Sequence, residues 1–250
     1  MDSKESEQGC IGSSRRSFLK LSGALTAWSV LGAGTVSTVA AADSLTKAQR
    51  DAMTPEAILA AMKKGNERFR KGLVNETRVL LAQQRASAKG QYPAAVLLTC
   101  IDSRAPAETI MDLGIGDVFN CRVAGNVSND DILGSMEFAC KLAGAKVVLV
   151  MGHTACGAIK GAIDNAELGN LTGLLARIKP AVSETVYTGE RTAKNYDFVD
   201  AVAHKNVELT IGNIRQRSPV LAELEKQHAI VIAGAMYNLA TGVVDFFPLK

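Results

Sequence analysis

Two apolar runs decide the fold that this sequence predicts: Ala94-Ala-Val-Leu-Leu-Thr-Cys100 and Lys146-Val-Val-Leu-Val-Met-Gly152. Continuous apolar runs of this length are typical of strands that are covered on both faces, as the strands of a parallel sheet are. Weaker runs predict three further strands, at residues 117–124, 230–237 and, after a turn, 243–247.

Helical patterns lie between the predicted strands. Thr54 can cap a helix that starts at Pro55, because proline has no N–H group to leave unpaired at the first helical position. Asp130 or Asp131 can cap a second helix that runs to Leu142. Periodic apolar residues predict further helices at 171–186, with a bend at Pro180, at 197–214 and at 219–227.

This alternation of strands and helices predicts an α/β fold: a mostly parallel β-sheet flanked by helices on both faces. In such sheets, ligands bind beyond the carboxyl ends of the strands. The length of the chain after residue 42 suits a single domain, which we expect to span residues 43–250.

The composition is that of a globular protein. Of 250 residues, 47% are apolar, and 28 Lys and Arg residues balance 25 Asp and Glu residues to a net charge of +3. Nucleic-acid-binding domains usually carry a strongly basic face, so this near-balance argues against a nucleic-acid partner. Five cysteines are too few for a disulfide scaffold in a chain of this length.

Residues 1–42 have the organisation of a cleaved export signal. Ser14-Arg-Arg-Ser-Phe-Leu-Lys20 resembles the twin-arginine motif, a modest apolar stretch follows at 21–39, and Ala40-Ala-Ala42 supplies a small-residue cleavage site. We therefore expect cleavage before Asp43, an interaction with the twin-arginine export machinery, and a periplasmic or otherwise exported location. Export would follow folding in the cytoplasm, because twin-arginine substrates travel folded.

The alternative for the stretch at 21–39 is an uncleaved membrane-spanning helix, since 19 residues can just cross a bilayer. Arg15 and Arg16 would fit the cytoplasmic side of such an anchor. Gly, Ser and Thr residues dilute the stretch, however, and make it a poor span. The sequence thus favours a removable leader and no permanent membrane anchor.

Soft metal ligands follow two of the predicted strands. Cys100 ends the first apolar run, and His153 and Cys156 follow the run that ends at Gly152. If the two strands are neighbours, the three side chains converge, and a Cys₂His set with an open fourth position is typical of catalytic zinc. The pattern predicts one zinc ion per chain. The alternatives are a reduced structural thiol pair or a disulfide formed after export.

The other cysteines and histidines of the chain have no such motif. Cys121 and Cys140 are interpreted as buried free thiols, with a disulfide between them as the alternative. His204 and His228 are interpreted as surface or packing residues, with a place in a proton path as the alternative for His204.

Three ordered motifs carry a resemblance to a known family: Cys100-Ile-Asp-Ser-Arg104, Arg122-Val-Ala-Gly-Asn126 and Gly152-His-Thr-Ala-Cys-Gly-Ala-Ile-Lys160. Together they resemble the β-class carbonic anhydrases, over roughly residues 54–250. The resemblance implies a parallel sheet flanked by helices, assembled as a homodimer or a higher multiple of it. It also implies that amino-terminal helices embrace the partner subunit, a role that the helix at 54–70 would fit.

The resemblance further implies an activity and roles for the site residues. Cys100, His153 and Cys156 would be the zinc ligands, and a zinc-bound hydroxide would attack CO₂ to give bicarbonate and a proton. Asp102 and Arg104 would form the catalytic dyad, in which Arg104 holds Asp102 away from the metal. If this hold is released, Asp102 would become the fourth zinc ligand and close the site.

The sequence also departs from this family's pattern. Ile101 stands where a small residue is usual, Leu113 and Gly114 stand where many members place a glutamine, and Leu97 stands where some members have a tryptophan of an inhibitory bicarbonate site. Two alternatives therefore stay open. One is a zinc hydrolase of COS or CS₂ on the same fold, and the other is a non-catalytic zinc- or bicarbonate-binding protein.

Overall fold

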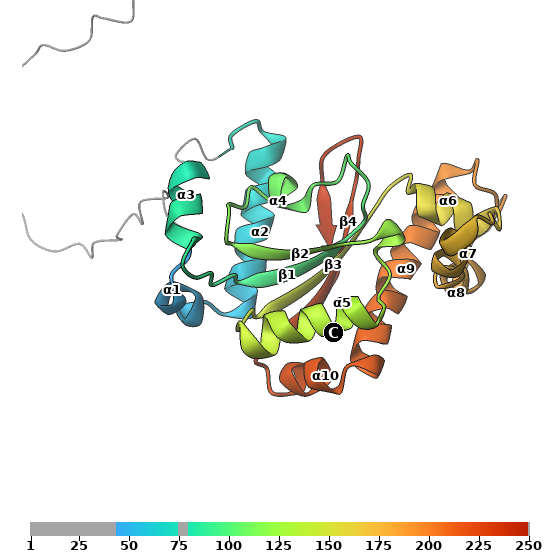
Figure 1. The fold of residues 1–250 in the computed structure, drawn as a ribbon. Helices are drawn as coiled ribbons and strands as arrows, with labels where there is room; N and C mark the ends of the chain where they lie inside the picture. Colours follow the sequence, from blue (N-terminus) through green and yellow to red (C-terminus); the bar gives the residue numbers. More distant parts are fainter. Residues whose placement is uncertain (1–43, 75–79, 250) are drawn as a thin grey trace, which may run out of the picture. The chain divides into compact units, whose positions relative to one another are not determined.

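The two apolar runs form neighbouring parallel strands within a five-stranded sheet. The computed structural model describes residues 44–74 and 80–249, so the expected leader lies outside the described residues. The strands follow the order β2-β1-β3-β4-β5 (Figure 1), and β5 alone is antiparallel to its neighbour in this sheet. Their bounds are β1 Ala95–Thr99, β2 Val118–Arg122, β3 Val147–His153, β4 Val231–Tyr237 and β5 Val244–Phe246.

Helices occupy the connections between these strands, as the sequence predicts. The α-helices of the described residues are α1 Lys47–Ala52, α2 Pro55–Arg70, α3 Leu80–Ser87, α4 Ala107–Ile110, α5 Asp130–Glu137, α6 Gly157–Ile163, α7 Gly169–Ala176, α8 Lys179–Glu184, α9 Tyr196–Arg217 and α10 Pro219–Lys226. A 3₁₀ turn, η1 (Ala124–Asn126), follows β2, and a π-helical turn, η2 (Phe138–Leu142), extends α5. The predicted α/β class with a mostly parallel sheet is confirmed.

One face of the sheet is covered by α2 and α4. Leu97 of β1 and Leu149 of β3 pack there in one buried cluster with Met62 of α2 and Ile110 of α4. The predicted cap of α2 is confirmed, because Thr54 Oγ1 accepts a hydrogen bond from Ala57 N at 3.2 Å. The apolar face of α2 therefore packs against the sheet of the same chain.

The opposite face is covered by α5, α9 and α10 (Figure 1). Alternate strand residues, Val96 and Val148, point to this side and pack in a second buried cluster with Met136 of α5 and Ile214 of α9. This alternation is the period of two that a strand imposes on its side chains. Because both faces are buried, β1 is apolar from Ala95 to Leu98 and β3 from Val147 to Met151.

A third cluster lies beyond the carboxyl ends of β1 and β3. Ile159 of α6, Leu175 of α7 and Phe198 of α9 are buried there around Cys100 and Cys156. The candidate metal ligands are thus built into a packed core rather than carried on an open loop.

Two helix predictions are wrong in detail. Asn129, rather than Asp130 or Asp131, caps α5: its Oδ1 accepts a hydrogen bond from Ile132 N at 2.9 Å. Asn129 has the extended backbone that a capping residue needs. The two aspartates already lie in the first turn of the helix, where their negative charges interact favourably with the helix dipole.

The single bent helix predicted at 171–186 is two helices, α7 and α8. Pro180 has no N–H group to donate to the carbonyl group of Ala176, so a helix cannot continue through it unbroken. The chain breaks at Arg177–Ile178, and Pro180 becomes the second residue of α8, where its missing donor costs nothing.

None of the helices within residues 44–74 and 80–249 has the length and apolar character that crossing a membrane requires.

Close packing of α2 against the end of α4 depends on Gly65. A Cβ atom at this position would lie 1.9 Å from the backbone oxygen of Met111. Gly65→Ala should therefore force α2 away from its seat and lower the free energy of unfolding by about 1–3 kcal/mol.

The matched control is Gly212→Ala in α9, where an added Cβ would meet no atom within 4 Å. This variant should be neutral or more stable by up to about 1 kcal/mol, because alanine favours helices over glycine. Denaturant unfolding of both variants checks the comparison, and equal midpoints would contradict it.

Candidate metal centre

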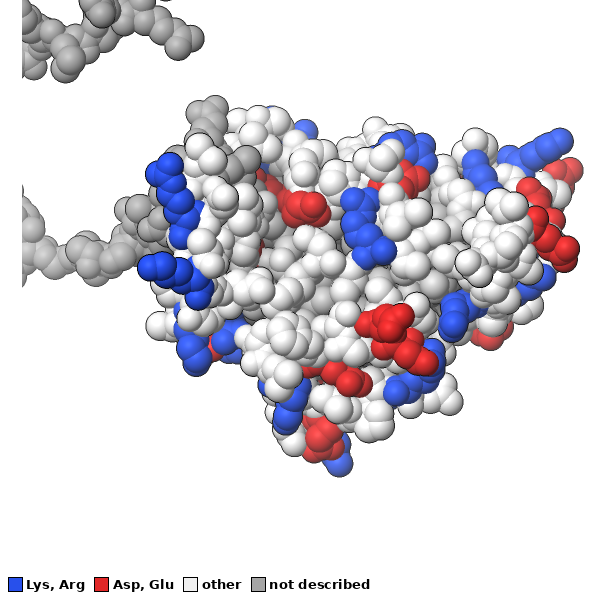
Figure 2. Space-filling view, viewed as in Figure 1, with Lys and Arg blue, Asp and Glu red and all other residues white. Residues whose placement is uncertain are grey.

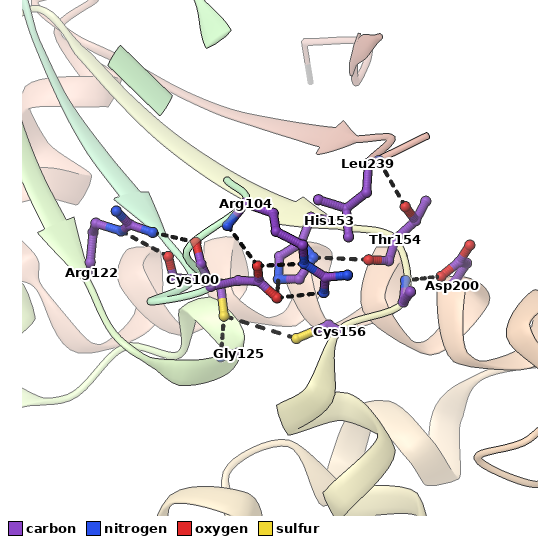
Figure 3. Close-up of polar contacts among 11 residues, drawn as sticks. Cys100, Arg104, Arg122, Gly125, His153, Thr154, Cys156, Asp200 and Leu239 are labelled. Atoms are coloured by element: carbon purple, nitrogen blue, oxygen red, sulfur yellow. Dashed lines mark hydrogen bonds and ion pairs between the residues drawn. The ribbon is translucent and has the colours of Figure 1, made fainter. Parts of the chain in front are cut away.

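Cys100, His153 and Cys156 come together at the carboxyl edge of the sheet (Figure 3). Cys100 directly follows β1, His153 is the last residue of β3, and Cys156 is the N-terminal capping residue of α6. Their ligand atoms all lie within 4.8 Å of one another, and all three residues are buried. Pairing of Thr99 with Met151 explains the meeting, because it places the ends of β1 and β3 side by side.

The geometry of this group fits a tetrahedral zinc ion. Cys100 Sγ and Cys156 Sγ lie 4.0 Å apart, and two thiolates with Zn–S bonds of about 2.3 Å would be separated by about 3.8 Å. His153 Nδ1 lies 2.9 Å from the carbonyl oxygen of Thr154 and must donate to it. In the neutral ring Nε2 is then unprotonated, and this buried atom has no hydrogen-bond partner among the described residues.

The three donors shift one another's pKa values. The hydrogen bond from Cys156 holds the pKa of Cys100 well below its usual range, at about 4, in spite of burial. The same bond, together with burial, raises the pKa of Cys156. Burial acts to lower the pKa of His153, but contact with Cys100 outweighs it and the pKa is raised. A divalent ion among these donors would favour two thiolates and a neutral imidazole.

Asp102 borders this group and is held by Arg104. Arg104 donates from Nε to Asp102 Oδ1 at 3.0 Å and from Nη2 to Oδ2 at 2.8 Å, and its backbone N–H donates to Oδ1 at 2.9 Å. The guanidinium group holds the pKa of Asp102 well below its usual range. Asp102 Oδ2 lies 3.8 Å from His153 Nε2. In this arrangement Asp102 pairs with Arg104 and lies beside the three metal-ligand candidates.

Two further residues support Cys100 in ways that no sequence motif indicates. Arg122 donates to the carbonyl oxygens of Cys100, at 2.9 Å, and Asp102, at 2.6 Å, and so clamps the loop after β1. Gly125 N donates to Cys100 Sγ at 3.3 Å, and Asn206 Nδ2 holds the carbonyl of the same Gly125 at 2.7 Å. Arg122 and Gly125 both belong to the motif at 122–126, but the motif does not indicate these roles, because they depend on contacts with residues distant in sequence.

The turn between His153 and Cys156 is held from two sides. Thr154 N donates to Tyr237 O at 2.9 Å. Leu239 N donates to Thr154 Oγ1 at 3.0 Å (Figure 3). On the other side, Ala155 N donates to Asp200 Oδ1 at 2.7 Å. Asp200 was not predicted as a site residue, because a lone aspartate 44 positions after Cys156 has no local signal.

The remaining candidates lie outside this group. Cys121 and Cys140 are free thiols, and burial raises the pKa of both, that of Cys140 to about 12. His204 stacks on Phe247 with ring centroids 4.1 Å apart. His228 follows α10 with a φ of +56°.

Comparisons with known proteins identify the family of this chain. A family model described as carbonic anhydrase matches residues 95–244, which include all three ligand candidates and the Asp102–Arg104 pair. The carbonic anhydrase 2 of Mycobacterium tuberculosis is 34% identical over 189 residues, which cover 75% of this chain and 90% of that relative. The chain belongs to the carbonic anhydrase family.

Solved structures place this carbonic anhydrase in the β class. The β-carbonic anhydrase CafA of Aspergillus fumigatus is 26% identical with a TM-score of 0.61, and the match covers 77% of this chain and 89% of that one. A tetrameric β-carbonic anhydrase of Sordaria macrospora is 25% identical with a TM-score of 0.58, covering 64% and 83% of the two chains. The chain is accordingly an enzyme of the carbonate dehydratase type.

Metal content provides the test of the three donors in this carbonic anhydrase. The purified chain should carry one zinc ion. His153→Ala or Cys156→Ser should weaken zinc binding by more than roughly 10- to 100-fold, which is the loss typical of mutating a residue that only hydrogen-bonds to a ligand. Elemental analysis after dialysis against a chelator measures the loss.

The control is Cys121→Ser, which removes a thiol that lies outside the cluster. It should leave the zinc content unchanged. Full zinc occupancy in His153→Ala would show that the ion is held elsewhere.

Proposed function

We propose that this chain catalyses the reversible hydration of CO₂ to bicarbonate and a proton. The observation that carries the proposal is the arrangement of three buried soft donors beside a carboxylate that an arginine holds aside. Zinc, held by Cys100, His153 and Cys156, would act as a Lewis acid that lowers the pKa of water to about 7 and so supplies a nucleophile at neutral pH.

Asp102 has the task of directing the nucleophile. Its lowered pKa keeps the carboxylate ionised, so it can only accept hydrogen bonds. It accepts one from the attacking oxygen species and turns the lone pair of that oxygen toward the carbon of CO₂. The new C–O bond forms as one C=O electron pair moves onto oxygen, and the proton lost from water passes to solvent.

Arg104 has the task of keeping Asp102 in this orientation. Two side-chain hydrogen bonds and one from the backbone leave the carboxylate little freedom. The arginine side chain is 58% exposed, whereas that of Asp102 is 15% exposed, so the pair lies at the border between solvent and the buried donors. Release of Arg104 would free Asp102 to become a fourth metal ligand, which we propose as the closed, inactive form.

Hydrolysis of COS or CS₂ by the same site is the less favoured function. Both are linear electrophiles open to the same attack, but family membership and the relatives' names point to CO₂. A non-catalytic binding protein is less favoured as well, because the Asp102–Arg104 geometry would serve no purpose in simple zinc storage.

We also propose that the chain assembles as a homodimer or a higher multiple. A related β-carbonic anhydrase is described as tetrameric. In this chain β2 is an edge strand, and Phe138 of η2, which is 51% exposed, packs edge-to-face on Phe119 of β2 with ring centroids 6.1 Å apart. Apolar side chains beside an unpaired strand edge favour association with another copy.

The Asp102–Arg104 pair supplies the test of the function. The zinc-loaded chain should hydrate CO₂ faster than it hydrolyses COS or CS₂. Asp102→Ala and Arg104→Ala should each keep zinc but lose activity by about 100-fold or more, because a misdirected nucleophile rarely meets its target. Stopped-flow measurement of proton release follows the reaction.

Arg217→Ala is the matched control, since it removes an arginine from an exposed ion pair with Asp130. It should hydrate CO₂ at the wild-type rate. A zinc-loaded wild-type chain without turnover would identify a binding protein instead, and a preference for COS or CS₂ would identify the hydrolase.

We propose, finally, that residues 1–42 direct the folded enzyme out of the cytoplasm and are then removed, which leaves one domain at 43–250. The twin arginines, the modest apolar stretch and the small-residue site at 40–42 support this location. The family match begins at residue 95, so the leader lies apart from the matched region. The donor set gives a physical reason for the route: two thiols must capture zinc while reduced, before they meet an oxidising compartment.

Replacing Arg15 and Arg16 with lysine should retain an uncleaved, active enzyme in the cytoplasm, because the receptor reads the paired arginines. Cell fractionation and amino-terminal sequencing locate the protein and its first residue. Processing and export of the double variant at the wild-type rate would contradict this route. A mature chain that still contains residues 21–39 would identify an anchor.

A further inference from the structure

One peptide group connects a carboxylate on α9 to the candidate ligand His153. The carbonyl of the Thr154–Ala155 peptide accepts the hydrogen bond from His153 Nδ1 at 2.9 Å. The N–H of the same peptide donates to Asp200 Oδ1 at 2.7 Å. Figure 3 draws both contacts, one on each side of the turn. Asp200 thus acts on one end of a rigid, planar group whose other end fixes the imidazole ring.

We propose that Asp200 is a positioning residue of the metal centre: by holding the Thr154–Ala155 peptide, it keeps His153 in the tautomer and orientation that turn Nε2 toward the ion. In many metal sites a carboxylate accepts directly from the second nitrogen of a ligating histidine. Here a peptide group stands between the two. The proposal rests on the proposed metal site.

The backbone gives the reason why this peptide needs to be held. Ala155 has a φ of +54°, in the left-handed region that a residue with a Cβ atom rarely adopts. A flip of the Thr154–Ala155 peptide changes ψ of Thr154 and φ of Ala155 together, so it would carry Ala155 out of this region. It would also turn the carbonyl away from His153. Backbone strain therefore favours the flip, and the hydrogen bond to Asp200 opposes it.

The other contacts of the turn do not prevent such a flip. The bond from Thr154 N to Tyr237 O holds the preceding peptide group. The bond from Leu239 N to Thr154 Oγ1 holds a side chain. Neither contacts the Thr154–Ala155 peptide, which leaves its N–H to Asp200.

Asp200 is itself firmly placed. Phe198, Val199 and Val202, on the same helix, are fully buried in the cluster that also contains Cys156. A shift of Asp200 away from the turn would have to move this part of α9 and its packed neighbours. The helix therefore sets the position of the carboxylate, and the carboxylate sets the position of the peptide.

Three variants test the proposal through zinc affinity, measured by competition with a chelator. Asp200→Ala should weaken zinc binding by about 10- to 100-fold, the usual effect of losing an outer-shell partner. Asp200→Asn should lose less, because its amide oxygen can still accept from Ala155. Asp197→Asn removes the same charge from an exposed position three residues earlier in α9 and should bind zinc as the wild type does.

Ala155→Gly separates this role from a general loss of structure. Glycine adopts the left-handed region without strain, so the double variant Asp200→Ala/Ala155→Gly should recover most of the zinc affinity that Asp200→Ala loses. The absorption spectrum of the Co²⁺-substituted protein should change in Asp200→Ala and return toward that of the wild type in the double variant. Wild-type affinity and spectrum in Asp200→Ala, or no recovery in the double variant, would overturn the proposal.

A metal-free measurement keeps the inference separate from the proposed function. The chain has three histidines, so the ring nitrogens of His153 can be assigned by ¹⁵N NMR. At a pH where the ring is neutral, His153 should carry its proton on Nδ1 in the wild type and lose this preference in Asp200→Ala. If the wild type bound no zinc, the metal site would be wrong while this result still decided the role of Asp200. An unchanged tautomer would reject that role.

Discussion

The parallel pairing of β1 with β3 is the interaction on which the rest of the site depends. Its register sets Thr99 beside Met151, so the first residue after β1 and the last residue of β3 come to the same edge of the sheet. Cys100 and His153, far apart in sequence, thereby meet without any loop that must be ordered for the purpose. The helices that bury both faces of the sheet hold this register, because a slip of one residue would exchange the side chains that pack against α2 and α4 with those that pack against α5, α9 and α10.

The site adds local constraints to this rigid edge. Cys100 is approached by the amide of Gly125, and the loop after it is clamped by Arg122 through two carbonyl oxygens. On the other strand, a left-handed alanine between His153 and Cys156 lets a four-residue turn present both side chains to one point. Each ligand candidate is thus fixed by contacts from distant segments, and little reorganisation is left for the moment at which an ion or substrate arrives.

Sequence patterns predict the strands from the apolar runs, and they predict that the two cysteines converge with His153 on the condition that the two strands are neighbours. The adjacency itself is shown only by the structure, in which Thr99 pairs with Met151. The patterns do not predict the cap of α5, since Asn129, Asp130 and Asp131 are all good capping residues and only the backbone conformation selects one of them. The sequence does not predict the contacts of Asp200 and Asn206 either, for another reason. Each is a single polar residue on a long helix, and its partner is decided by how α9 packs against the turn and against η1.

The span between the soft donors has a thermodynamic consequence. Cys100 and Cys156 are 56 positions apart in the chain, and β1, β2, α5 and β3 are ordered within or next to that span. An ion held by both cysteines would close this loop reversibly in the native state and would be absent from the unfolded chain. At a free ion concentration about 1,000 times the dissociation constant, such linkage adds about 4 kcal/mol to stability. The metal supply of the compartment in which the chain folds would therefore set the fraction of chains that are folded, as well as the fraction of sites that are loaded.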